Sequence, residues 1–123
     1  MHMTEDEFAQ AVHEALEQVP DRFQQALHNI AITVADEPTA QQKADTNCTD
    51  GGELLGLYQG IPLPQRTTGY AGVMPDVITI FKGPHERVCQ TKDQMVHQIG
   101  ITVLHELGHY FGFDDAYLHS HGY

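Results

Sequence analysis

The segment that most constrains how this chain can fold is residues 105–115, His-Glu-Leu-Gly-His-Tyr-Phe-Gly-Phe-Asp-Asp, or HExxHxxGxxD. Two histidines stand four residues apart in this segment. In an α-helix, four residues span one turn plus about 40° of rotation. His105 and His109 would therefore project from one helix face, about 6 Å apart along the axis. We expect this segment to be helical.

The expected helix has sequence signals at both ends. Thr91 followed by Gln94 has the spacing of a capping box, which opens a helix. We expect that helix to run to about Phe111. Gly112 then stands where a helix end favours a left-handed residue. The sequence predicts one long C-terminal helix with the motif near its end.

The side chains on this helix face have the chemistry of a metal site. Two imidazole nitrogens with this spacing can reach one zinc ion at ~2.0–2.1 Å. Glu106 lies one step round the helix, beside the ion rather than on it. From there its carboxylate can take a proton from water at the metal and deliver it to a leaving amine. The motif predicts a zinc site with Glu106 as the general base.

A catalytic zinc site needs a third protein ligand, because three protein ligands plus water is the usual count. Gly112 lets the chain leave the helix and turn back, since Gly adopts positive φ without a steric penalty. We predict that Asp115 then brings its carboxylate to the ion. A downstream Glu is excluded because none follows His109. The open alternatives are Asp114, His119 and His121.

The rest of the chain is expected to form short helices and strands. Thr4 with Glu7 predicts a capping box that opens a helix, Pro20 ends that helix, and a second helix follows over residues 21–28. Short β-rich segments and polar loops with Pro and Gly alternate after it: strands 30–34, 54–58 and 77–81, and loops 36–52 and 65–75. Residues 1–123 are expected to form a single α+β domain, a small short-stranded sheet packed on the long C-terminal helix.

Composition limits the partners of this chain. Lys and Arg total 6 against 17 for Asp and Glu, a formal net charge of -11. Such a surface repels nucleic acid and anionic lipid and favours neutral or basic partners. The acidic N-terminus is not followed by an apolar run, and no segment approaches the roughly 18 apolar residues of a membrane span. We expect a cytoplasmic protein that binds neither nucleic acid nor membrane.

The motif resembles that of the zincin metallopeptidases, and its spacing matches the metzincin motif with Asp115 in place of the third His. The resemblance is closer to the minimal zincins, small bacterial zincin-like metallopeptidases, and it covers most of the chain. Four segments carry it: residues 29–38, 55–63, 75–84 and 103–112. The resemblance implies an α+β zincin-like fold and a zinc site at His105, His109 and Asp115. It also implies hydrolysis of a peptide or protein substrate.

The chain departs from the larger metzincins after the motif. Only eight residues follow Asp115 and none is Met. Residues 1–123 carry no counterpart of the Met-turn or the C-terminal subdomain of the metzincins, so we expect one wall of the substrate cleft to be absent from this chain. We expect a second copy of the chain or a partner protein to complete the cleft.

Two other functions fit parts of the motif. A bacterial endoribonuclease family uses HGxLHLxGYDH, but Glu106 stands where that family has Gly, and Asp115 stands where it has a third His. The other is a non-catalytic zinc module, which would leave Glu106 unexplained.

Several residues outside the motif are candidates for other roles. Residues 77–81 are either an edge strand that binds an extended peptide or a central core strand. Candidates to stabilise an oxyanion are Tyr58, Arg66, Tyr70 and Tyr117. Four histidines have no ligand spacing: His2, His13, His28 and His85.

Overall fold

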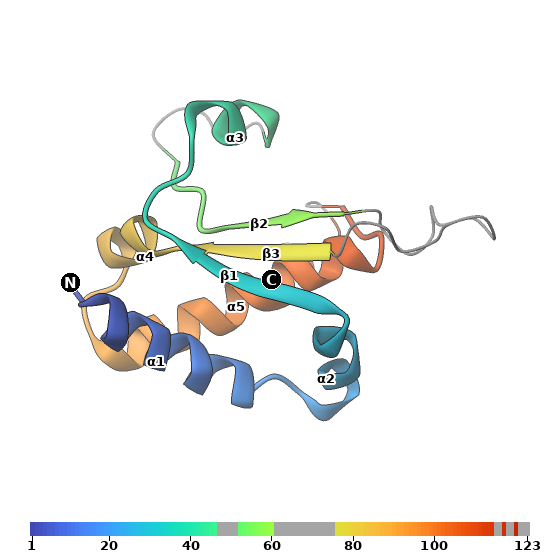
Figure 1. The fold of residues 1–123 in the computed structure, drawn as a ribbon, viewed down its shortest axis with the longest axis horizontal. Helices are drawn as coiled ribbons and strands as arrows, with labels where there is room; N and C mark the ends of the chain where they lie inside the picture. Colours follow the sequence, from blue (N-terminus) through green and yellow to red (C-terminus); the bar gives the residue numbers. More distant parts are fainter. Residues whose placement is uncertain (47–51, 61–75, 115–116, 118–119, 121–123) are drawn as a thin grey trace.

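The computed structural model describes residues 1–46, 52–60 and 76–114, with Tyr117 and Ser120. It confirms the α+β class: a three-stranded sheet lies against a long C-terminal helix (Figure 1). The elements, in chain order, are α1 (Glu5–Glu17), α2 (Asp21–His28), β1 (Ile30–Ala35), α3 (Ala40–Asp45), β2 (Gly56–Gln59), β3 (Asp76–Phe81), α4 (Lys82–Val88) and α5 (Lys92–Tyr110).

The sheet has the strand order β1-β3-β2. β1 runs parallel to β3, with Ile32 opposite Ile78, and β2 runs antiparallel to β3, with Tyr58 opposite Ile78. β3 is thus paired on both sides, and Ile78 and Ile80 are fully buried. The interpretation of residues 77–81 as an edge strand is therefore wrong, because no side of β3 is left for a peptide. In the described sheet the outer strands are β1 and β2.

The core lies between the sheet and the helices α1 and α5, which pack against each other. Their fully buried side chains recur at helical spacing and meet the two buried isoleucines of β3. Burial of a Phe, Met, Ile or Val side chain contributes roughly 1.5–3 kcal/mol. Those at 0% exposure on the two helices are Phe8, Ala11, Met95, Ile99 and Val103. This packing fixes the face of α5 that carries the motif relative to the sheet.

The helix ends follow the predicted signals with one difference. Thr4 and Glu7 form the predicted capping box at α1. At α5 the Thr91 hydroxyl accepts the Gln94 N–H at 3.1 Å, but Oε1 of Gln94 accepts the N–H of Gln90 at 2.8 Å. The second predicted box is therefore half formed, because its reciprocal bond goes one residue further back.

Two helices were not predicted. α3 lies within the segment expected to be a loop, where Thr39 and Gln42 form a capping box. It has no buried residue, so it lacks the apolar period that reveals a helix. α4 follows β3 directly, and Pro84 lies in its first turn, where a missing N–H costs nothing. Residues 65–75, the other expected loop, lie outside the described residues.

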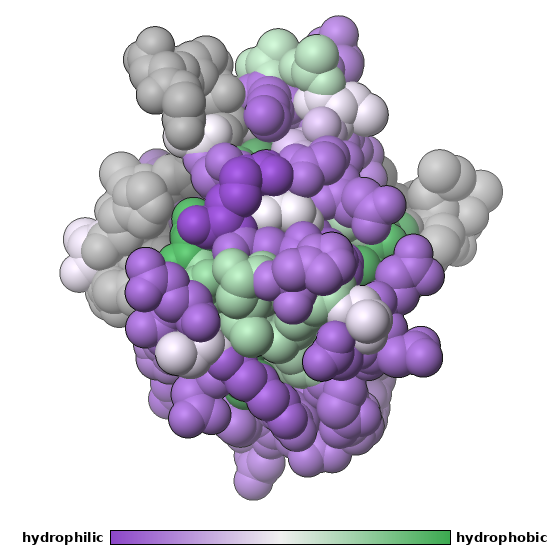
Figure 2. All heavy atoms as spheres, turned by 90° about the vertical axis from the view of Figure 1, so that its left-hand side faces the viewer, coloured by the Kyte–Doolittle hydropathy of each residue, from purple (hydrophilic) through white to green (hydrophobic). Residues whose placement is uncertain are grey.

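One end of the molecule has a largely polar surface. Figure 2 shows the end of the molecule that holds α4 and the N-terminus, and most of that face is hydrophilic. Within the described part of the chain, no helix is both long and apolar enough to cross a membrane.

Candidate metal centre

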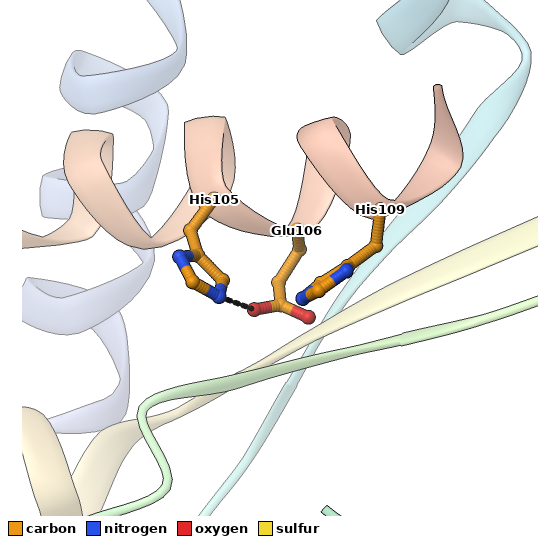
Figure 3. A group of neighbouring side chains, drawn as sticks. All are labelled: His105, Glu106 and His109. Carbon is orange, nitrogen blue, oxygen red and sulfur yellow. Dashed lines mark ion pairs between the residues drawn. The ribbon is translucent and has the colours of Figure 1, made fainter. Parts of the chain in front are cut away.

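The last turns of α5 bring three side chains together on the side of the helix that faces the strands: His105, Glu106 and His109 (Figure 3). One ligand atom from each lies within 4.8 Å of the others. The two imidazole rings have centroids 4.9 Å apart and an interplanar angle of 77°. Among the described residues, no other group of His, Cys, Asp and Glu has this geometry. The predicted helical face is confirmed.

The chain turn after α5 orients His109. Gly112 has φ 91°, the left-handed conformation expected for it, and Phe113 N–H donates to the Gly108 carbonyl at 3.0 Å. The Phe113 carbonyl then lies 2.9 Å from Nδ1 of His109. A carbonyl only accepts hydrogen bonds, so Nδ1 carries the proton and Nε2 keeps the lone pair that binds a metal. The sequence predicted this turn but not its bond to the imidazole.

Glu106 is nearly buried, with 8% of its surface exposed. Its Oε1 accepts the backbone N–H of Tyr58, in β2, at 2.9 Å. Its Oε2 lies 3.9 Å from Nε2 of His105. Oε1 is thus held by the sheet, and Oε2 faces His105.

The alternation of an antiparallel ladder explains why β2 can hold Glu106. The Leu55 carbonyl accepts Phe81 N–H at 3.0 Å, so Leu55 pairs with β3. Hydrogen-bonded and non-bonded positions alternate along such a pair. Gly56 and Tyr58 therefore direct their backbone polar groups away from β3. The outer edge of β2 faces the carboxylate of Glu106.

Gly56 allows β2 and α5 to approach closely. A Cβ atom at Gly56 would lie 2.5 Å from Cγ2 of Thr102 and 3.3 Å from Cγ of Glu106. The first distance is far below van der Waals contact, so a side chain larger than hydrogen would push the helix away from the strand.

A cavity of about 220 Å³ opens beside two side chains of the motif, His105 and Glu106. Its walls come from the segment before β2 and from the preceding turns of α5. Its apolar lining includes Leu54, Leu55 and Ile101, and its polar lining includes Glu53 and Gln98. The cavity is a neighbouring space large enough for a side chain of a bound molecule.

The predicted third ligand, Asp115, lies outside the described residues, as do His119 and His121. Asp114 is described. Its Oδ1 accepts the N–H of Tyr117 at 2.8 Å, and it is not part of the group formed by the two histidines and Glu106. The geometry therefore gives Asp114 a local turn-stabilising bond, and Asp115 stays a prediction.

The oxyanion candidates fall in different places. Tyr58 reaches the centre through its backbone, while its hydroxyl donates to Oδ2 of Asp76 at 3.1 Å. Tyr117 is 44% exposed, and its ring stacks on Phe113 with centroids 4.4 Å apart. Arg66 and Tyr70 lie outside the described residues.

The donor set fits a divalent metal. Two imidazole nitrogens and a nearby carboxylate on one helix face suit zinc, which prefers nitrogen, sulfur and carboxylate ligands. A small α+β fold with HExxH on its long helix defines a metal-site protein of the zincin class.

Comparison with known proteins agrees with this class. The family model for zincin-like metallopeptidases matches residues 27–123, and the chain belongs to that family. The fold is similar to the solved structure of a conserved hypothetical protein from Thermus thermophilus. The TM-score is 0.58 at 23% identity, covering 87% of this chain and 92% of that one. A search of curated proteins found no match. The family implies a metal, usually zinc, and a hydrolase.

Proposed function

We propose that this chain is a zinc-dependent hydrolase of peptide or amide bonds, with Glu106 as the general base. His105, His109 and Asp115 would hold the ion. The observation that carries the proposal is the gathering of both imidazoles and Glu106 on one face of α5, with Glu106 bonded to the outer edge of β2. A non-catalytic zinc module would not need a buried carboxylate held beside the ligands.

Each residue has a defined task in this mechanism. A zinc ion, when bound, supplies Lewis acidity that polarises a carbonyl and makes water more acidic. Glu106 takes the proton from the attacking water and returns it to the leaving amine. Oε2 is the oxygen that does so, because it faces Nε2 of His105 while Oε1 accepts the Tyr58 N–H. His109 would bind the ion through Nε2, since Nδ1–H donates to the Phe113 carbonyl.

The substrate is proposed to be an extended peptide or protein segment lying along the outer edge of β2. Gly56 directs its backbone N–H and carbonyl to that side, which suits main-chain pairing with a peptide. The 220 Å³ cavity beside His105 would take a substrate side chain. The net charge of -11 favours a neutral or basic segment and disfavours nucleic acid. A second copy or a partner protein is proposed to supply the remaining wall.

Metal content is the test of the site. Native mass spectrometry and elemental analysis would be run on wild type, His109→Ala and Asp115→Ala, with His97→Ala as the matched control. His97 is an exposed histidine two turns earlier on the same helix. We expect one zinc per chain in wild type and in the control, and loss of zinc in the two site variants. Zinc retained by Asp115→Ala would mean that another residue is the third ligand.

Hydrolysis is the test of the mechanism. Wild type and Glu106→Gln would be screened against the same peptide library, each loaded with zinc. We expect Glu106→Gln to keep the metal and lose cleavage by at least about 100-fold, the usual contribution of general base catalysis. An active Glu106→Gln protein would exclude this base. Zinc-loaded wild type that cleaves no peptide would favour the non-catalytic module.

A further inference from the structure

His85 lies outside the motif and has no ligand spacing in the sequence, yet its side chain is completely buried. Its ring packs near Phe8, with centroids 5.9 Å apart. Nδ1 lies 2.7 Å from the Phe81 carbonyl, and Nε2 lies 3.0 Å from Oγ1 of Thr102. The imidazole thus connects the end of β3 to the middle of α5. Both nitrogens of this buried ring have a partner, as expected because an unbonded buried polar group is costly.

The direction of each hydrogen bond follows from the donors available. The Phe81 carbonyl only accepts, so Nδ1 of His85 carries a proton. Burial lowers the pKa of His85 and favours the neutral ring. In a neutral ring Nε2 then has no proton, and the hydroxyl of Thr102 must donate to it. That hydroxyl is also 3.0 Å from the Gln98 carbonyl, its alternative acceptor within α5.

Thr102 stands four residues before Glu106, about one helical turn, on the same face of α5. Its Cγ2 is the atom that a Cβ on Gly56 would meet first, at 2.5 Å. Thr102 therefore touches β2 with its methyl group and His85 with its hydroxyl. The Glu106 carboxylate reaches Tyr58 N–H from the next turn.

We infer that His85 and Thr102 are positioning residues that hold α5 against β2 at the distance where Glu106 meets the Tyr58 N–H. The hydrogen bond between Nε2 of His85 and Oγ1 of Thr102 fixes the position of Thr102. The contact of the Thr102 methyl group with Gly56 limits how closely α5 can approach β2. The importance of this arrangement for hydrolysis rests on the proposed function. The role of His85 and Thr102 in holding α5 against β2 does not rest on it. It concerns the Glu106–Tyr58 bond, which is measurable without any substrate.

The first experiment measures amide hydrogen exchange of Tyr58 by NMR in the zinc-loaded protein. Thr102→Val keeps the shape and the methyl contact and removes the hydroxyl, while Thr102→Ser keeps the hydroxyl. Thr33→Val is the control, because it removes a surface hydroxyl pair with Thr79 in the same sheet. We expect Thr102→Val to speed Tyr58 exchange about 3- to 10-fold, the loss of one hydrogen bond. Exchange in Thr102→Ser and Thr33→Val should stay near wild type.

Two further measurements separate positioning from general stability. In hydrolysis assays, Thr102→Val should lower kcat several-fold with KM and zinc content unchanged, and Thr102→Ser should restore kcat. The ¹⁵N chemical shifts of His85 in wild type should show a protonated Nδ1 and an unprotonated Nε2. This measurement does not depend on the results for the variants. The inference would be overturned if the Tyr58 amide of Thr102→Val exchanged at the same rate as that of wild type. It would also be overturned if the neutral His85 ring carried its proton on Nε2. Absence of hydrolysis in wild type would count against the proposed function and leave the exchange result to decide the positional claim.

Discussion

The backbone N–H of Tyr58 donates to Oε1 of Glu106 across 2.9 Å, although the two residues are 48 positions apart in the chain. The bond joins the outer edge of β2 to the carboxylate of the HExxH motif. It means that β2, along which we propose that the substrate lies, and the proposed general base have a fixed relative position. Small changes in the contact between β2 and α5 should therefore affect hydrolysis more than metal binding.

Gly56→Ala should disturb this contact directly. The new Cβ would lie 2.5 Å from Cγ2 of Thr102, so α5 and β2 must separate locally. Overpacking of this kind costs about 1–3 kcal/mol of unfolding free energy. We expect that loss in urea unfolding, together with a lower kcat and one zinc still bound per chain. Unchanged stability and kcat would show that the strand and helix can adjust without moving Glu106.

Gly100→Ala is the matched control for Gly56→Ala. Gly100 lies inside α5, and a Cβ there would meet nothing within 4 Å. Ala is favoured over Gly in a helix interior by about 0.5–1 kcal/mol. The same urea experiment should therefore show a gain in stability, with kcat unaltered.

The motif helix was predictable because its signals are local. The spacing of His105 and His109, the Thr91 cap and the terminal Gly112 all lie within one element, so the sequence carries them directly. The minimal-zincin resemblance was confirmed by the family match over residues 27–123. The α+β class was predictable because helical and β-rich segments alternate along the sequence.

The long-range features were not predictable in the same way. The central place of β3 and the Tyr58–Glu106 bond depend on strand order, which short-range patterns do not encode. The burial of His85 is not readable from the sequence, because it results from α1, α4 and α5 packing around it and no ligand spacing marks it. α3 was missed because a helix without a buried face has no apolar period, and only its Thr39 cap could have indicated it.

The buried His85 should make the zinc-free protein sensitive to mild acid. Burial lowers its folded pKa below the ordinary value of 6.5, whereas the unfolded chain titrates near that value. Below pH 6.5 the unfolded state therefore binds more protons than the folded state. The contribution of neutral His85 to the unfolding free energy is fully present above this pH and is lost as the pH falls. Urea unfolding at about pH 7.5, 6.5 and 5.5 should show the decline, and His85→Gln should flatten it. A wild-type stability independent of pH across this range would contradict the buried neutral ring.

Arg87 should have only a modest effect on stability although it bridges two carboxylates. It donates to Glu37 and Glu53 at 2.6–2.8 Å, but its side chain is 46% exposed and that of Glu37 is 50% exposed. Ion pairs this exposed contribute about 1 kcal/mol or less after solvent screening. Arg87→Gln should therefore unfold at nearly the wild-type urea concentration.

The same variant should have a clear local effect on the two carboxyl groups. Hydrogen bonds from Arg87 are the main cause that lowers the pKa of both Glu37 and Glu53. In Arg87→Gln both pKa values should rise towards the ordinary value of 4.5, as followed by ¹³C NMR titration. The stability that these carboxylates contribute is present above that value and lost at lower pH, so the variant should be less sensitive to strong acid than wild type. Unchanged carboxyl titration would mean that the bridge does not persist in solution.

Gly112→Ala should weaken zinc binding without touching a ligand. Gly112 has φ 91°, a conformation that costs a residue with a Cβ about 1–2 kcal/mol. Relief of that strain would move the Phe113 carbonyl, which lies 2.9 Å from Nδ1 of His109 and fixes its tautomer. Loss of such a partner typically lowers metal affinity about 10- to 100-fold. Competition with a chromophoric chelator should show a decrease of this size for Gly112→Ala and a smaller one for Gly112→Asn, because Asn tolerates the left-handed conformation better. Equal affinities in all three proteins would mean that His109 is oriented by the metal itself rather than by the turn.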